Sequence, residues 1–446
     1  MIKSFIPIAE ALVNEISYKI NNYEFGLKEA EEQIRSFVNS IGQNLLEKVV
    51  DSITEPTQEN RFIIDGDIAI YRDTQNLRLK TIFGKELIRP RRVYKLKDKK
   101  GGYYPLDEKL GTHMCKGFSP AVTSLICILG CTLPYNQSSR ILSEALGFPI
   151  SSTGVETNSE HIGNSIDHRP MNSIPEEKQH DVCDLMLVSM DGTMSPRIKE
   201  VPGIIGRESM KQPTEYKECN VVVIQKFEED KHTKDKTYTL KDKWTGAAYG
   251  PRNNFEQYIH QAGIKMGQLK AKKVVFIADG LNSNWDIKVT CFPDAIEILD
   301  FYHASEHLAQ FCNLIESPNR AKQKYAIWRT MLLEGEVLQV ITELKDEMES
   351  ISDKDEGQKH INYFTNNEKR MEYDFYRKQG FPIGSGVVEG ACKFVVGKRF
   401  KGSGMRWKKK DNENVLALRI AYLNNYLSRY FQSKYPCIEL YIPKVA

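Results

Sequence analysis

The sequence lacks the features that mark exported or membrane-spanning proteins. Its nine cysteines are scattered singly among 446 residues, with no CxxC pair and no zinc-ribbon spacing, so free thiols in a reducing compartment are expected. The amphipathic N-terminus contains acidic residues and no signal-peptide core. No apolar run approaches the roughly 18 residues of a membrane span. These absences predict a cytoplasmic protein without a membrane partner.

The sequence also lacks an excess of either charge. Lysine and arginine number 62 against 59 acidic residues, which leaves a net charge of +3. Any affinity for nucleic acid must therefore come from local basic patches. A hydrophobic content of 41% and a charged content of 27% are typical of globular proteins. The length predicts roughly two to four substructures.

Residues 1–110 combine helical and strand-like patterns. Apolar residues recur at helical spacing up to about residue 55. Two strand-like segments then flank Phe83, Gly84 and Lys85, which predicts a β-hairpin. The basic residues of its second strand could lie along a DNA end or form a solvated face: Arg89, Arg91, Arg92 and Lys95.

Residues 111–175 predict three short helices in the outline of a helix-turn-helix. In that outline the third helix, which begins near Ser151, would enter the DNA major groove. Small three-helix packings also occur in proteins that bind no DNA, so both interpretations stay open.

Residues 182–304 have an α/β pattern. The segments DLMLVSMDG and KKVVFIADG are apolar strands that deliver Asp191 and Asp279, each followed by glycine. The carboxyl ends of neighbouring strands open into one crevice, so these side chains could share a site. With a third carboxylate they could hold two divalent ions about 4 Å apart. Oxygen ligands favour Mg²⁺ or Mn²⁺. The alternative is that each aspartate is only a turn or helix-cap residue, because Asp before Gly is common at such positions.

The segment FPIGSGVVEGACKFVVGKRFKGSGMRWKKK opens residues 381–446. It predicts a glycine-rich turn, a helix that carries Glu389, and a basic tail with interleaved aromatic residues. Such a tail could hold DNA phosphates, and its tryptophan could stack on an unpaired base. The candidate DNA contacts are Lys393, Lys398, Arg399, Lys401, Arg406, Trp407, Lys408, Lys409 and Lys410. The alternative is that Phe394 and Trp407 pack against the sheet while the lysines are solvated.

Four segments in this order resemble the DDE transposases of bacterial insertion sequences, specifically the Kra group. They are VSMDGT, IADGLNSNW, FPDAIEILDFYHASEHL and RMEYDFYRKQGFPIGSGVVEGACKFVVGKRFKGSGMRW. The resemblance covers about residues 184–425. It implies an α/β RNase H-like core with a mixed sheet flanked by helices, interrupted by a helical insertion at residues 305–380.

The resemblance also implies the functional residues. Its acidic triad would be Asp191, Asp279 and Glu389, and its DxxH motif would end in His303. His303 could position a scissile phosphate or a metal-bound water, or could be structural. Members of this group often carry paired cysteines before the segment that appears here as PLDEKLG. Because these cysteines are absent, a structural zinc is not expected.

These observations predict a bacterial transposase that cuts and joins phosphodiester bonds by two-metal-ion catalysis, with Mg²⁺ or Mn²⁺ as its cofactor. Its expected partners are DNA, as terminal inverted repeats and target, and further copies of itself on that DNA. A nucleoid-associated location would follow. The alternatives are an RNase H-like nuclease that hydrolyses without strand transfer and a non-catalytic DNA-binding descendant.

Overall fold

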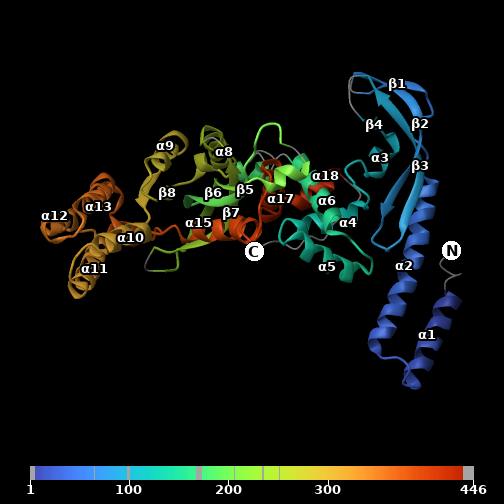
Figure 1. Cartoon of the computed structure of the whole chain (residues 1–446), viewed down its shortest axis with the longest axis horizontal. Coiled ribbons are helices and arrows are strands. Elements are labelled where there is room, and N and C mark those ends of the chain that lie inside the picture. Colours follow the sequence, from blue (N-terminus) through green and yellow to red (C-terminus); the bar gives the residue numbers. More distant parts are fainter. Residues whose placement is uncertain are drawn as a thin grey trace. The chain divides into compact units, whose positions relative to one another are not determined.

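Two separate sheets organise the chain, one in each of two compact units (Figure 1). The computed structural model describes residues 6–64, 66–97, 101–166, 173–204, 206–233, 236–250 and 252–434. The first unit takes in the described residues up to Gly130, Pro134–Asn158 and the last few from Phe431 onward. The second takes in Cys131–Leu133 and Ser159–Tyr430. None of the described helices combines the length and apolar character needed to cross a bilayer.

The first unit contains an antiparallel sheet preceded by two helices. The helices are α1 (Ile6–Asn21) and α2 (Leu27–Ser52), and the strands, in sheet order, are β1 (Arg61–Ile64), β2 (Asp67–Lys80), β3 (Glu86–Leu96) and β4 (Gly102–Tyr103). The hairpin between β2 and β3 turns where it was predicted. Its turn is closed by a 3.0 Å bond from the Thr81 N–H to the Lys85 carbonyl. Gly84 adopts a φ of 84°, which favours glycine.

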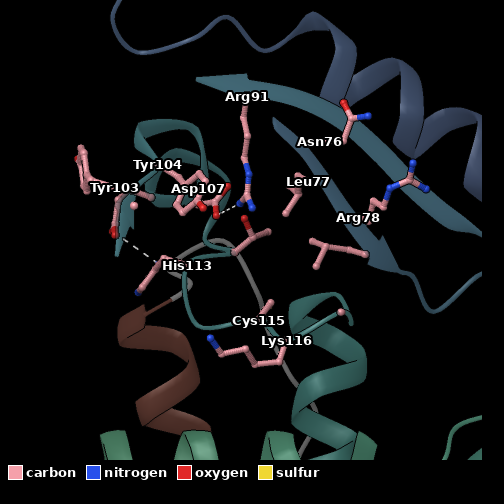
Figure 2. Close-up of a pocket in the computed structure, with 15 residues that line it drawn as sticks. Asn76, Leu77, Arg78, Arg91, Tyr103, Tyr104, Asp107, His113, Cys115 and Lys116 are labelled. Carbon is pink, nitrogen blue, oxygen red and sulfur yellow. Dashed lines mark hydrogen bonds and ion pairs between the residues drawn. The ribbon is translucent and has the colours of Figure 1, made fainter. Parts of the chain in front are cut away.

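The basic side chains of this hairpin are largely engaged within the first unit. Figure 2 shows Arg91 extending from β3 to Asp107 on the short helix α3 (Pro105–Leu110). The contacts are Arg89 with Asp51 at 3.4 Å, Arg91 with Asp107, and Arg92 over the Tyr71 ring at 4.0 Å. Lys95 is exposed. Three of the four cations therefore stabilise the unit rather than forming a continuous solvated face.

Three helices follow, as predicted. They are α4 (Pro120–Gly130), α5 (Tyr135–Leu146) and α6 (Ser152–Ser165). Val122, Ile126 and Leu142 belong to the small apolar core that they share. The first turns of α6 expose Ser152, Thr153 and Glu156. Groove binding by α6 stays a prediction.

The second unit is built on a five-stranded mixed sheet. Its strands are β5 (Leu185–Ile198), β6 (Thr214–Glu229), β7 (Tyr238–Tyr249), β8 (Val274–Ala278) and β9 (Ile296–Leu299). The order is β7-β6-β5-β8-β9, antiparallel from β7 to β5 and parallel from β5 to β9. Residues 185–190 are all buried, as expected for a strand with both faces covered. This mixed α/β architecture is compatible with an RNase H-like fold.

Helices surround this sheet and extend beyond it. Those beside the strands are α8 (Arg252–Lys265), α9 (Asn282–Cys291) and α17 (Lys409–Leu423). A further helix, α18 (Tyr426–Lys434), follows α17 in the chain. The helices between β9 and the C-terminal segment form a separate group at one end of the sheet (Figure 1). These are α10 (Phe301–Cys312), α11 (Pro318–Leu333), α12 (Val337–Glu347), α13 (Lys354–Asn367) and α14 (Tyr373–Lys378). Their apolar residues, such as Phe311, Trp328 and Phe364, are buried in a core continuous with that of the sheet.

The helix that carries Glu389 is irregular. It begins as α15 (Gly386–Ala391), widens into a π-helical turn, η7 (Cys392–Gly397), and ends as α16 (Lys398–Phe400). A π turn contains one more residue than an α turn and is frequent at functional sites. The helix lies against β5 and β6.

Two predicted strand ends were wrong. β5 does not end at Asp191 but continues to Ile198, because β6 remains its antiparallel partner after β8 has stopped at Ala278. The strand containing AIEIL ends at Leu299, and His303 lies in α10. The cause is Asp300, whose carboxylate caps this helix and so ends the strand.

Candidate metal centre

Three aspartates lie at one level of the sheet of the second unit. In the parallel pairing of β5 with β8, Ser189 is opposite Ile277, so continuing this register places Asp191 opposite Asp279. The pairing of β8 with β9 places Asp279 opposite Asp300 in the same way. A 2.9 Å bond from the Asp300 N–H to the Ala278 carbonyl maintains this register beyond the strands. Neighbouring strands are about 4.8 Å apart, so the three carboxylates lie close together at the carboxyl end of the parallel strands. This group of Asp191, Asp279 and Asp300 is called the acidic edge below.

Asp191 is half-buried beside other charges. Its Oδ1 accepts a 2.7 Å bond from the Gly192 N–H, and the Cys392 thiol donates to the same carboxylate. Burial raises the pKa of Asp191, and the negative charge of Asp279 raises it further, whereas these two donors and His303 oppose the rise. A cation at this position would therefore stabilise the carboxylate pair.

Asp279 is held in place by the segment that follows it. Its Oδ1 accepts from the Leu281 N–H at 3.1 Å and from Asn284 Nδ2 at 2.6 Å. Both bonds end on one oxygen, which fixes the orientation of the carboxylate and leaves Oδ2 for another ligand.

The glycines that follow Asp191 and Asp279 leave room for side chains from other parts of the chain. Neither has a positive φ, so the backbone conformation alone does not require glycine at either position. A Cβ at Gly192 would lie 2.4 Å from the Glu218 carboxylate, and one at Gly280 would lie 2.3 Å from the Tyr363 ring. Any larger residue would displace these neighbours.

Tyr363 comes to the site from the helical insertion. It lies on α13, and its ring stacks on His307 with centroids 3.7 Å apart. Its buried hydroxyl makes no hydrogen bond with any described residue. Burial raises the pKa of Tyr363, and the charges of Asp279 and Asp300 add to the rise. An unused hydroxyl thus lies beside the acidic edge.

Asp300 connects two distant parts of the chain. Its fully buried carboxylate caps α10, accepting from the Tyr302 N–H at 2.6 Å. The other oxygen accepts from the Ser385 N–H at 2.9 Å and from the Ser385 hydroxyl. Ser385 is the N-cap residue of α15, so one carboxylate fixes the starts of two helices.

Glu389 lies close to Asp300 and to His303 in the first turn of α10. Asp300, His303 and Glu389 each offer a ligand atom within 4.8 Å of the other two. His303 Nδ1 lies 3.3 Å from Asp300 Oδ2. Contact with Asp300 raises the pKa of His303 to about 9 despite its partial burial, and the charge of Asp279 adds to this. The imidazole is therefore protonated at neutral pH.

The structure thus groups the predicted residues in a particular way. Asp191 and Asp279 lie side by side in register, and Glu389 lies with His303 and Asp300. Among the described residues, no close group of three ligands contains all of the expected triad. His303 links the two sets electrostatically, because its positive charge acts on Asp191 and it responds to Asp279.

The basic tail divides into exposed and buried cations. Lys393, Lys398, Lys401, Arg406, Lys408, Lys409 and Lys410 are exposed. The expectation that Arg399 and Trp407 face DNA was wrong, because they are 1% and 8% exposed. The Arg399 guanidinium lies 4.7 Å from the Trp407 ring, and Trp407 Nε1 donates to the Phe400 carbonyl at 3.3 Å. The alternative in which this tryptophan packs within the protein is confirmed.

Three side chains near the site were not identified from the sequence. Tyr363 lies in the predicted helical insertion, where no motif marks it as a site residue. Cys392 and Ser385 lie in the Glu389 segment, but nothing in the pattern signals their contacts with Asp191 and Asp300. Their roles depend on contacts between segments far apart in the chain.

Comparisons with known proteins give little additional information. The sequence matches no protein-family model and no curated protein. Among solved structures, a match to the Drosophila P element transposase strand transfer complex has 10% identity and a TM-score of 0.25. It covers 74% of this chain and 83% of that chain. A TM-score this low carries no argument, so function must be inferred from the site itself.

The contact between Ser385 and Asp300 predicts a measurable loss of stability. Ser385→Ala removes one hydrogen bond to a buried carboxylate, which should lower the free energy of unfolding by about 1.5–3 kcal/mol. Denaturation followed by tryptophan fluorescence reports on the second unit, which contains all four tryptophans. Ser305→Ala is the matched control, because this similarly buried hydroxyl donates to a neutral backbone carbonyl. Equal losses in the two variants would argue against a special role for Asp300.

The raised pKa of His303 predicts a pH dependence of stability without metal. Its pKa is about 9 in the folded protein against an ordinary value of 6.5. The stabilisation is therefore fully present below pH 6.5 and lost as the pH rises through about 9, and amounts to at most about 3 kcal/mol before solvent screening. His303→Gln should abolish this dependence. Parallel stability curves for the two proteins between pH 6.5 and 9 would contradict the assignment.

Proposed function

We propose that this protein is a metal-dependent DNA transposase of the DDE type, from a bacterial insertion sequence. The observation that carries the proposal is the convergence of Asp191, Asp279 and Asp300 on one edge of a mixed sheet. The helix that bears Glu389 lies on this edge as well. An acidic cluster beside exposed cations has the chemistry to act on a phosphodiester backbone.

The residues present fit divalent cations. Carboxylate oxygens are the ligands that Mg²⁺ and Mn²⁺ prefer. Asp191, Asp279 and Glu389 would hold two such ions. Burial and, to a smaller extent, the charge of Asp279 raise the pKa of Asp191, and a bound cation would oppose both effects. When bound, the ions would activate a water or a 3′-hydroxyl and stabilise the leaving oxygen.

The remaining groups of the site would position the reactants. Asn284 and the Leu281 N–H orient the Asp279 carboxylate. Asp300 orients Glu389 through the start of α15, and protonated His303 would hold a phosphate oxygen close to the carboxylates. Lys393 and Lys401 lie on the same C-terminal segment and would neutralise the adjoining phosphates.

Replacing each proposed ligand without changing its shape tests the triad. Asp191→Asn, Asp279→Asn and Glu389→Gln should each lower DNA cleavage by about 100-fold or more, because each removes a negative charge from the metal site. Folding and DNA binding should be retained. Asp286→Asn, an exposed change on the neighbouring helix α9, is the control. A variant that still cleaves would remove its residue from the triad.

A DNA substrate with transposon ends distinguishes a transposase from a nuclease. With DNA that carries the inverted repeats flanking the gene, a transposase joins the cut end to a target, whereas a nuclease releases it. Cleavage without joined products would favour the RNase H-like nuclease. Wild-type protein that binds the ends but never cuts them would favour a non-catalytic descendant.

The exposed lysines at the start of α17 predict a salt-dependent contribution to DNA binding. Replacing Lys408, Lys409 and Lys410 with Ala should weaken binding and reduce the slope of log K against log salt by up to about 3. The control replaces Lys345, Lys354 and Lys359 of the insertion, which are equally exposed. If both triple variants keep the wild-type slope, these three lysines do not contact DNA.

A further inference from the structure

The first two helices expose an unusual amount of apolar surface. Of the 31 large hydrophobic residues that are exposed in the described chain, 11 fall between residues 6 and 49. Tyr23 is 97% exposed, Leu27 74% and Val38 55%. An apolar surface of this extent on one helical hairpin marks an interaction site rather than scattered exposure.

The exposed residues of α2 form a coiled-coil seam. Ile34, Val38, Ile41 and Leu45 follow each other at intervals of four, three and four residues, as at the a and d positions of a heptad repeat. Three of them are exposed, and Ile41 is half-buried.

The opposite side of α2 contacts the β2–β3 hairpin. Gln43 is nine positions from Ile34, or about 180° around a helix, and it accepts a 2.7 Å bond from the Thr81 hydroxyl of the β2–β3 hairpin. Lys85 of the same hairpin reaches Ser40 at 3.4 Å. The sheet therefore contacts α2 on the side opposite its seam. Figure 1 shows α2 running beside the strands of this unit.

The seam is complementary to itself. Glu31 precedes it by three residues and Lys48 follows it by three, so the six positions have the same spacing in both directions. If a second α2 runs antiparallel about a two-fold axis between Val38 and Ile41, these two residues pair with each other. Ile34 then pairs with Leu45, and Glu31 pairs with Lys48 at each end. A two-fold interface requires this kind of self-complementarity.

The net charge of helices α1 and α2 disfavours DNA or anionic lipid as the partner of this surface. Helices α1 and α2 contain four basic and seven acidic residues. A net negative surface repels DNA and anionic lipid headgroups, both of which need clustered lysine and arginine. The chemistry of the surface therefore favours a protein partner with an equally apolar helix.

The second helix alone is too short for a stable pair. Its seam from Glu31 to Lys48 is about 26 Å long, less than the three or four heptads that a sustained coiled coil contains. Helix α1 supplies more surface, because Ile6, Val13 and Ile20 recur at intervals of seven and are 50%, 58% and 40% exposed. Two hairpins together would provide four helices, enough for a bundle.

We infer that two copies of this chain associate through antiparallel pairing of their α2 helices, centred between Val38 and Ile41. The association is independent of the proposed function, because it needs neither DNA nor metal. The interface leaves the β2–β3 hairpin in its contact with α2.

Sedimentation velocity of the full chain without DNA tests the association. Wild-type protein should be a dimer over a wide range of concentrations. Val38→Lys puts two like charges at the two-fold axis and should weaken the dimer by about 100-fold or more. Leu338→Lys makes the same change at a residue of α12 that is 65% exposed and should leave the dimer intact. Circular dichroism checks that both variants remain folded. A monomeric wild type, or a Val38→Lys variant that remains dimeric, would overturn the inference.

Charge reversal tests the antiparallel register. Glu31→Lys alone and Lys48→Glu alone should each weaken the dimer, because they place like charges opposite each other. The double variant restores two opposite-charge pairs and should recover the wild-type affinity. In a parallel dimer each residue would face its own copy, and the double variant would recover nothing. Absence of recovery therefore overturns the register and with it the proposal.

Discussion

A single buried carboxylate determines the geometry of the acidic edge. Asp300 has no exposed surface and accepts hydrogen bonds from the first turn of α10 and from Ser385, which is 85 positions away. A carboxyl group this deep is tolerated only when its oxygens are hydrogen-bonded. Because one partner begins the insertion and the other begins the Glu389 helix, both segments are fixed to the sheet at the same point. A bond from the Phe301 N–H to the Ile383 carbonyl, 2.9 Å long, reinforces the junction.

The group of helices α10 to α14, between β9 and the Glu389 segment, contributes to the site. Its first helix carries His303, and α13 places Tyr363 against Gly280. The protonated imidazole provides a fixed positive charge among carboxylates that would otherwise repel one another. The ring of Tyr363, which stacks on His307, lies beside Gly280. Loss of the insertion would therefore change the electrostatics of the aspartates as well as the size of the protein.

Much of this arrangement could be predicted from local patterns. Continuous apolar runs identified β5 and β8, and the glycine-rich turn before Glu389 identified the start of its helix. The pattern could not indicate that β5 continues past Asp191, because its end depends on the partner strand β6. Likewise, Trp407 and Arg399 have the composition of a DNA-binding tail, and only the packing of the tail against β5 buries them. The predictions that failed are those that depend on contacts between distant segments.

The π-helical turn from Cys392 to Gly397 changes how this segment must be aligned with other sequences. A regular helix rotates by about 100° per residue, so an extra residue in one turn shifts the phase of everything after it. A helical wheel drawn through Glu389 and continued without correction would misplace Lys398 and Arg399 relative to the sheet. Homologues that lack the extra residue would have a gap of one within this helix, and their cations should be compared only after that gap is introduced.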